Sequence, residues 1–160
     1  MNSGAPFKSI GVIGGGAWGT ALASLCASNQ VETTLWARED AVIRSINARH
    51  ENSEYLPGVP LPKSLTAAKS LGMAAKSEAI LFAVPAQFAR TAFADLREAS
   101  DGRAIPVALC SKGIERSSGM MMTEILAAVW PEAEPAVLSG PSFARDVAMG
   151  LPTAVTLAAA

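Results

Sequence analysis

The sequence has little of the chemistry that proteins use to bind metals, form disulfides or hold nucleic acids. It contains one histidine, His50, and two cysteines, Cys26 and Cys110, which lack the spacing of metal ligands. Each cysteine lies in an apolar run, so we expect two buried thiols in a reducing compartment. The 13 basic and 14 acidic residues nearly cancel, and no basic run is present, which argues against a nucleic-acid partner.

Catalytic and membrane signals are missing as well. There is no Ser-His-Asp, HExxH or CxxC arrangement, no secretory signal and no apolar run long enough to cross a membrane. We therefore predict a cytoplasmic protein without a metal site. Half of the 160 residues are apolar, which suffices for one domain: a flexible tail over residues 1–7 and a folded domain over residues 8–160. The sequence stops within the apolar run 153–160, which we interpret as a truncation before a further domain.

Strand-like and helical patterns alternate along the whole chain. Strands are expected at residues 8–13, 31–36, 78–84, 105–110, 136–138 and 153–160. Helices are expected at residues 17–28, 40–47, 70–75, 87–98, 118–129 and 142–150, with Asp40, Ser118 and Ser142 as N-caps. This alternation predicts the α/β class: a Rossmann-like, doubly wound, mostly parallel sheet with helices on both faces.

A glycine-rich turn joins the first expected strand to the first expected helix. Gly14, Gly16 and Gly19 have the Gly-x-Gly-x-x-Gly spacing of a dinucleotide-binding turn. Gly14 allows the tight turn, Gly16 lets a pyrophosphate approach the backbone, and Gly19 lets the helix pack closely on the strand. The helix N-terminus adds unpaired N–H groups and a positive dipole end. Because the turn lies between a strand and a helix, we predict cofactor binding rather than a purely structural turn.

The residues that follow the other expected strands should converge with this turn at one crevice. Arg38 follows the second strand, where NAD-binding chains usually carry an acidic residue, and a guanidinium suits the 2′-phosphate of NADP. NADP is therefore favoured over NAD, although the adjacent Glu39 could turn inward instead. Lys112 could contact a substrate phosphate or simply be a solvated loop lysine. Ser142 could cap a helix, or its helix could present an N-terminus to a ligand.

Six segments together resemble the NAD(P)-dependent glycerol-3-phosphate dehydrogenases of the bacterial type. The resemblance spans nearly the whole chain, and its two last segments are the most specific. The segments are Gly-Gly-Gly-Ala-Trp-Gly-Thr-Ala-Leu-Ala at 14–23, Leu-Trp-Ala-Arg at 35–38, Tyr-Leu-Pro-Gly at 55–58, Phe-Ala-Val-Pro at 82–85, Ser-Lys-Gly-Ile-Glu at 111–115 and Leu-Ser-Gly-Pro-Ser-Phe-Ala at 138–144.

The resemblance implies hydride transfer between a nicotinamide cofactor and dihydroxyacetone phosphate, giving sn-glycerol 3-phosphate for phospholipid synthesis. It implies substrate contacts at Lys112, Gly140 and Ser142. It also implies cofactor contacts, which together with the glycine turn give the set Gly14, Gly16, Ala17, Trp18, Gly19, Arg38, Phe88, Lys112 and Ala144.

In the family that the chain resembles, the lysine that acts as general acid/base lies in an all-helical domain that follows the cofactor-binding domain. No catalytic residue is therefore expected among these 160 residues, which should turn over substrate negligibly on their own. The surface that would meet the helical domain should be apolar and exposed, so we expect a homo-oligomer.

Two other interpretations stay open. Another dehydrogenase of the same wider group, of the 6-phosphogluconate or hydroxyacyl-CoA type, would share the glycine turn. Residues 112–115 and 140–144 speak against it. A non-catalytic nucleotide-sensing module would also share the turn, but the apolar end of the sequence speaks against a natural product of this length.

Overall fold

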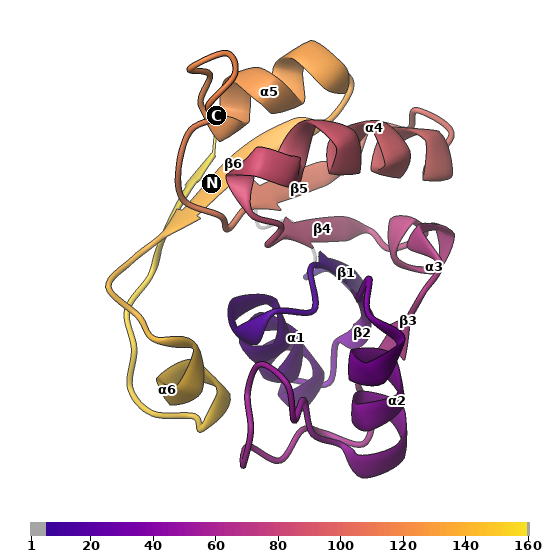
Figure 1. Cartoon of the computed structure of the whole chain (residues 1–160), viewed down its shortest axis with the longest axis vertical. Coiled ribbons are helices and arrows are strands. Elements are labelled where there is room, and N and C mark those ends of the chain that lie inside the picture. Colours follow the sequence, from indigo (N-terminus) through magenta and orange to yellow (C-terminus); the bar gives the residue numbers. More distant parts are fainter. Residues whose placement is uncertain (1–5, 160) are drawn as a thin grey trace.

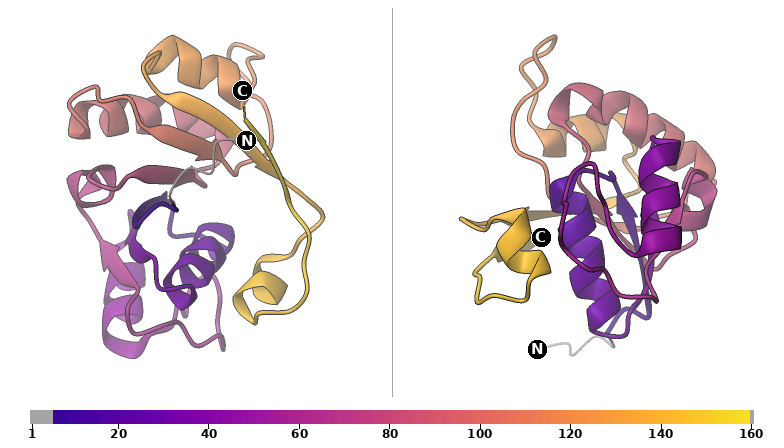
Figure 2. Two further views of the ribbon diagram at one scale, coloured as in Figure 1. Left: turned by 180° about the vertical axis from the view of Figure 1, so that it is seen from behind. Right: turned by 60° about the horizontal axis from the view of Figure 1, so that its bottom comes forward.

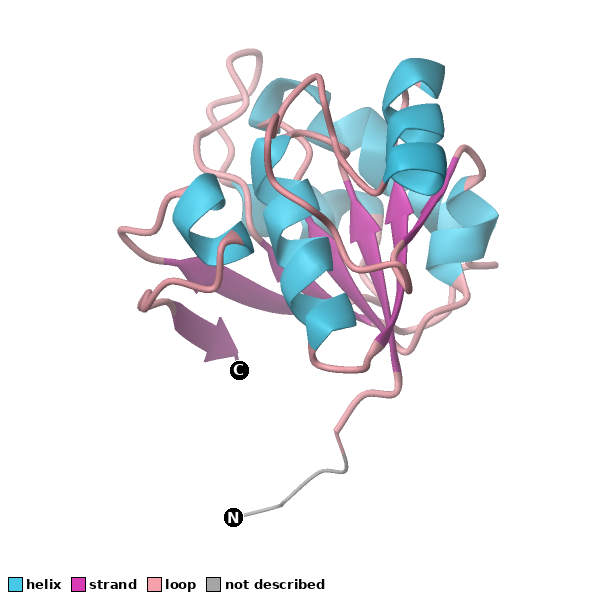
Figure 3. Cartoon of the chain, turned by 90° about the horizontal axis from the view of Figure 1, so that it is seen from below, coloured by secondary structure: helices cyan, strands magenta, loops and turns pink. Residues whose placement is uncertain are grey.

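The computed structural model describes residues 6–159 as three layers, with helices on both faces of one seven-stranded sheet (Figures 1 and 3). The strands are β1 (Ser9–Ile13), β2 (Glu32–Trp36), β3 (Thr66–Ala68), β4 (Ala79–Phe82), β5 (Pro106–Leu109), β6 (Glu134–Ser139) and β7 (Thr156–Ala159). The helices are α1 (Ala17–Ser28), α2 (Asp40–Arg49), α3 (Leu71–Ala75), α4 (Ala89–Ala99), α5 (Met122–Val129) and α6 (Ala144–Ala148). The predicted α/β class and doubly wound sheet are confirmed.

The order of the strands reverses beside β1. The sheet runs β3-β2-β1-β4-β5-β6-β7, so the chain moves outward in one direction from β1 to β3 and in the other from β4 to β7. All neighbouring strands are parallel except β6 and β7. In open α/β sheets of this kind, ligands bind at the carboxyl ends of the strands beside such a switch point. The end of β1, at Ile13, is that position.

The two faces of the sheet bury separate cores. Ile13 and Phe82 pack with α3, α4 and α5 on one face, and Val12 and Leu35 pack with α1 and α2 on the other. This division follows from the alternation of side chains along a strand. The rings of Phe82 and Phe93 lie 4.1 Å apart between their centroids, which ties α4 to β4. Both faces of β1 are therefore covered, and its carboxyl end is held in place from both sides.

Helix α6 does not pack on the sheet. It lies beside α1 at the far end of the long excursion between β6 and β7, as the two views of Figure 2 show. Val147 of α6 forms a small buried cluster with Ala21 of α1 and with Leu56 and Val59 from the loop after α2. Helix α1 thus supports both the glycine turn and this C-terminal excursion.

Three of the predicted helix caps were wrong. Asp40 is the first residue of α2, and its carboxylate pairs with Lys69 at 2.9 Å instead of capping the helix. Helix α5 begins at Met122, four residues after Ser118, and the Glu124 carboxylate accepts the Met121 N–H at 2.7 Å. In each case the predicted cap side chain has another partner, Lys69 for Asp40 and Glu115 for Ser118.

The cap at Ser142 was wrong for a similar reason. Helix α6 begins at Ala144, and the Ser142 hydroxyl donates to the Ala154 carbonyl at 2.9 Å, across the base of the excursion. Strand β3 was not predicted, because Thr66–Ala68 is only three residues long. Helix α4 begins at Ala89, after a single 3-10 turn over Ala86–Phe88.

Several other expectations concern the termini and the cysteines. Of the tail predicted over residues 1–7, residues 1–5 lie outside the described residues, and Phe7 is half exposed. Cys110 is buried, and burial raises the pKa of its thiol to about 12, whereas Cys26 is only partly buried. Among residues 6–159, no helix has the length and apolarity that crossing a membrane requires, and no cluster of three metal-ligating side chains occurs.

Candidate cofactor site

A cavity of about 550 Å³ opens at the carboxyl end of β1, where the strand order reverses. Its size is in the range of small-molecule and cofactor sites. Its walls come from the glycine turn, from the ends of β2 and β4, from the loop after α2 and from α3 and α4. The lining residues are Gly14, Gly15, Gly16, Ala17, Trp18, Gly19, Trp36, Arg38, Glu39, Tyr55, Leu71, Ala83, Val84, Pro85, Phe88, Thr91, Ala92 and Asp95.

The three glycines of the turn have different structural surroundings. Gly14 has a φ of +120°, and an added Cβ would lie 2.8 Å from the Ala83 carbonyl oxygen, so only glycine fits there. A Cβ on Gly19 would lie 1.9 Å from the carbonyl oxygen of Gly14, which shows how closely α1 packs on the turn. A Cβ on Gly16 would meet nothing within 4 Å. Gly16 therefore borders open space at the N-terminus of α1.

The predicted Arg38 lies at one end of the cavity within a group of alternating charges. Its guanidinium pairs with Glu39 at 2.9 Å, and both residues line the cavity. Lys69 pairs with Asp40 at 2.9 Å and also donates to the Arg38 carbonyl. The Arg38 side chain is 73% exposed, so a ligand can reach it directly from the cavity.

The opposite wall is mostly apolar and was largely missed from the sequence. Helix α4 and the turn before it contribute Phe88, Thr91, Ala92 and Asp95, at positions i, i+3, i+4 and i+7, which share one face of a helix. That periodicity, counted from Phe88, is the signal that could have found them. Tyr55 also lines the cavity; its segment, Tyr-Leu-Pro-Gly at 55–58, carried the family resemblance, but no site role was predicted for Tyr55.

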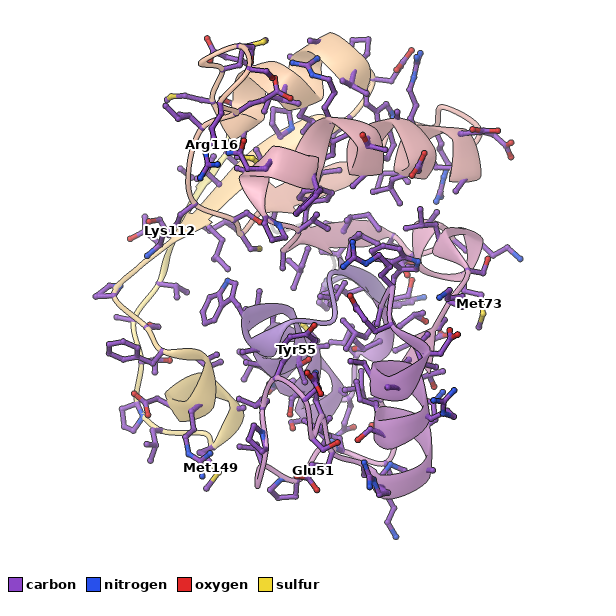
Figure 4. The ribbon with its side chains drawn as sticks, viewed as in Figure 1. Glu51, Tyr55, Met73, Lys112, Arg116 and Met149 are labelled. Atoms are coloured by element: carbon purple, nitrogen blue, oxygen red, sulfur yellow. The ribbon has the colours of Figure 1, made fainter. Side chains whose placement is uncertain are left out.

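Seven of the predicted cofactor residues lie together in this cavity: Gly14, Gly16, Ala17, Trp18, Gly19, Arg38 and Phe88. Four other predicted site residues, Lys112, Gly140, Ser142 and Ala144, do not line it. Lys112 is exposed on the loop after β5, away from Tyr55 (Figure 4). Gly140 lies beside the returning chain, where an added Cβ would come 2.6 Å from the Ala154 carbonyl oxygen.

The loop that carries Lys112 is fixed to the start of α4. The nearly buried carboxylate of Glu115 pairs with Arg90 of α4 at 2.7 Å and accepts from the Ser118 hydroxyl. Gln87 donates to the Ile114 carbonyl at 2.8 Å. Arg90, and then Ser118, lower the pKa of Glu115 from 4.5 to about 2. The ion pair between Arg90 and Glu115 holds the Lys112 loop against α4, the helix that contributes to the apolar wall of the cavity.

The depressed pKa of Glu115 makes a specific prediction about acid stability. A carboxyl with a lower pKa in the folded state stabilises the fold above pH 4.5, and this stabilisation is lost as the pH falls towards 2. We expect Glu115→Gln to lower the free energy of unfolding at pH 7, by an amount that shrinks between pH 4.5 and 2. Urea unfolding across this range measures it, with Glu54→Gln in an exposed loop as the control. A pH-independent difference would contradict the assignment.

The reversal of strand order, the glycine turn at the switch point and the cavity above it define a Rossmann-type domain. Residues 9–160 match the family model described as the N-terminus of NAD-dependent glycerol-3-phosphate dehydrogenase. The chain belongs to this family.

Individual relatives and solved structures agree with the family match. The chain is 50% identical over 153 residues to glycerol-3-phosphate dehydrogenase (NAD(P)+) of Parvibaculum lavamentivorans, covering 95% of this chain and 45% of that protein. It is 53% identical over 152 residues to the same-named protein of Rhodospirillum rubrum, covering 94% and 43%. The crystal structure of glycerol-3-phosphate dehydrogenase from Coxiella burnetii superposes with a TM-score of 0.86 at 32% identity, covering 94% of this chain and 46% of that one. The chain thus spans less than half the length of these relatives.

Proposed function

We propose that this chain binds NADPH or NADH in the cavity above the glycine turn, as the cofactor domain of an enzyme that interconverts dihydroxyacetone phosphate and sn-glycerol 3-phosphate. The observation that carries the proposal is the convergence of the glycine turn, Arg38 and Phe88 on one cavity at the switch point. The family membership supports the reaction, and the names of the relatives support either nicotinamide cofactor.

The chemistry of the cavity suits the parts of a dinucleotide. The N–H groups in the first turn of α1 lack helical partners and favour the pyrophosphate, which Gly16 lets approach. Arg38 suits a 2′-phosphate, and this favours NADPH over NADH. Phe88 and Pro85 offer an apolar wall to a ring. When bound, the reduced nicotinamide would supply a hydride to the substrate carbonyl.

The remaining site residues form part of the same proposal. Lys112 would contact both the cofactor and the substrate. Gly140 and Ser142 would contact the substrate, and Ala144 would contact the cofactor. The contacts of Glu115 and Gln87, which hold the Lys112 loop beside Phe88, support a position next to the cavity.

Assembly and location also belong to the proposal: a homo-oligomer in the cytoplasm, with the cofactor domain over residues 8–160. Exposed apolar side chains on the excursion from β6 to β7 support self-association. They are Phe143, Met149, Leu151, Val155 and Leu157.

Calorimetric titration with NADPH and NADH tests the proposal. We expect both to bind, NADPH more tightly, because the guanidinium of Arg38 can pair with the 2′-phosphate. Arg38→Ala should weaken NADPH binding about tenfold and leave NADH binding nearly unchanged. Arg44→Ala, an exposed arginine of α2 outside the cavity lining, is the matched control. Binding of neither dinucleotide would contradict the proposed function, whereas tighter binding of NADH would contradict only the preference for NADPH.

A further inference from the structure

Asn52 joins the loop after α2 to the glycine turn through a completely buried side chain. Its amide nitrogen Nδ2 donates to the Gly15 carbonyl at 2.9 Å and to Thr20 Oγ1 at 2.8 Å. Its oxygen Oδ1 accepts the N–H of Tyr55 at 3.1 Å. The side chain is 0% exposed, and both of its donor hydrogens and its acceptor oxygen are used. Asn52 itself does not line the cavity, but Gly15 and Tyr55 do.

The bond to Gly15 determines how the next peptide group is oriented. In a planar trans peptide, the C=O and the following N–H point in opposite directions. When Asn52 and Thr20 hold the Gly15 carbonyl on the buried side, the Gly16 N–H is directed away from that side. If the peptide turned over, a carbonyl oxygen would replace the N–H that faces a bound phosphate. One buried amide therefore selects the orientation of the peptide that can receive an anion.

The bond to Tyr55 fixes a second wall of the cavity. The loop is already anchored by apolar packing, since Leu56 and Val59 are buried against Ala21 of α1. Apolar contacts hold the loop in place without setting the direction of a neighbouring carbonyl. The hydrogen bonds of Asn52 orient the Gly15 carbonyl, and they also hold Tyr55 at the cavity beside α1 (Figure 4).

We propose that Asn52 is a positioning residue for the dinucleotide: it orients the Gly15–Gly16 peptide so that the Gly16 N–H donates to the pyrophosphate. This assignment rests on the proposed function. Asn52 acts only through the glycine turn, so its effect should be confined to ligands that carry the pyrophosphate. A ligand that engages only the end of the cavity near Arg38 should not depend on Asn52.

Two ligands separate this role from a general contribution to the fold. NADPH carries the pyrophosphate and the 2′-phosphate, whereas adenosine 2′-monophosphate carries only the latter. We expect Asn52→Leu, which keeps the approximate volume but removes the hydrogen bonds, to weaken NADPH binding roughly tenfold while the affinity for adenosine 2′-monophosphate changes less than about twofold. Calorimetry at matched salt measures both affinities, and urea unfolding reports the stability of each variant.

Ser45→Ala is the matched control. Ser45 is also a buried polar residue, and its hydroxyl bonds the Glu51 carbonyl and Ser53 in the same loop, without contacting the glycine turn. We expect Ser45→Ala to lower stability and leave the ratio of the two affinities unchanged. The positioning role would be overturned if Asn52→Leu had the same ratio of NADPH affinity to adenosine 2′-monophosphate affinity as the unmodified chain. This holds whether the two affinities are unchanged or fall together. If the unmodified chain bound neither NADPH nor NADH, the proposed function would be overturned, and this role with it.

A second measurement uses the unmodified chain and tests the proposed Gly16 hydrogen bond even if Asn52→Leu does not fold. In an ¹⁵N-labelled sample, saturation with NADPH should move the Gly16 amide proton downfield, as expected for a new hydrogen bond to an anion. Adenosine 2′-monophosphate should leave that resonance in place. A Gly16 resonance that does not respond to NADPH would overturn the assignment.

Discussion

Replacing Gly16 by alanine is expected to weaken NADPH binding tenfold or more and to leave the fold at least as stable. Gly16 has φ −70° and ψ −179°, which alanine adopts without strain, and its added Cβ would meet nothing within 4 Å. A glycine-to-alanine change at such a site typically stabilises a protein by about 0.4–1 kcal/mol. The space that the methyl group fills is, however, the space through which a pyrophosphate would approach α1. Calorimetry and urea unfolding measure the two effects separately.

Gly72→Ala provides the control for Gly16→Ala. Gly72 lies in α3 outside the cavity lining, and its added Cβ would lie at an ordinary contact distance of 3.5 Å from Ser70 Oγ. This variant should bind NADPH normally. Undiminished binding by Gly16→Ala would show that the pyrophosphate does not lie against the turn.

Replacing Gly19 by alanine is expected to damage both the fold and the binding. The added Cβ would lie 1.9 Å from the Gly14 carbonyl oxygen and 3.3 Å from the Ala83 side chain, at a buried position. Because the nearest obstacle is backbone, α1 would have to move away from β1. Overpacking of this kind typically lowers the free energy of unfolding by about 1–3 kcal/mol. Because the clash in Gly19→Ala is with backbone, we expect its loss to lie at or above the upper end of that range. Urea unfolding should show this loss, and NADPH affinity should fall with it.

Gly16→Ala and Gly19→Ala are therefore informative as a pair. Both add one methyl group to the same turn, and only the second should lower the free energy of unfolding. If Gly19→Ala were as stable as the unmodified chain, the close packing of α1 on the turn would be contradicted. If Gly16→Ala were also destabilised, its loss of binding could not be assigned to contact with the cofactor.

Most of the fold could be predicted from the sequence because local pattern and tertiary environment agree. Helix α1 has the bounds predicted from the run after the glycine turn, and β4 lies within the strand expected at residues 78–84. The errors arose where a distant partner overrides a local preference. Asp40 pairs with Lys69 and Ser142 bonds the chain returning to β7, so neither caps its helix. Strand β3 has too few residues for a periodic pattern.

The cavity lining was predicted from the residues alone where it follows a strand directly, and the family resemblance added Ala17, Trp18 and Phe88. The glycine turn and Arg38 meet this condition, and both line the cavity. Asn52 and Tyr55 do not, because their loop reaches the cavity through contacts with α1 that no spacing in the sequence encodes. The cavity-lining residues of α4 lie within a helix that was predicted. Which face of that helix meets the cavity depends on tertiary packing, such as that between Phe82 and Phe93.

The distribution of the tryptophans gives this chain a built-in optical probe. Trp18 and Trp36 line the cavity, whereas Trp130 is fully buried in the core beneath α4 and α5. Indole emission overlaps the absorption of a reduced nicotinamide, and energy transfer between them falls steeply with distance. Quenching on titration with NADPH should therefore come most strongly from Trp18 and Trp36, while the emission maximum of Trp130 reports whether the core is intact. Occupancy and folding can thus be read from the same unlabelled sample.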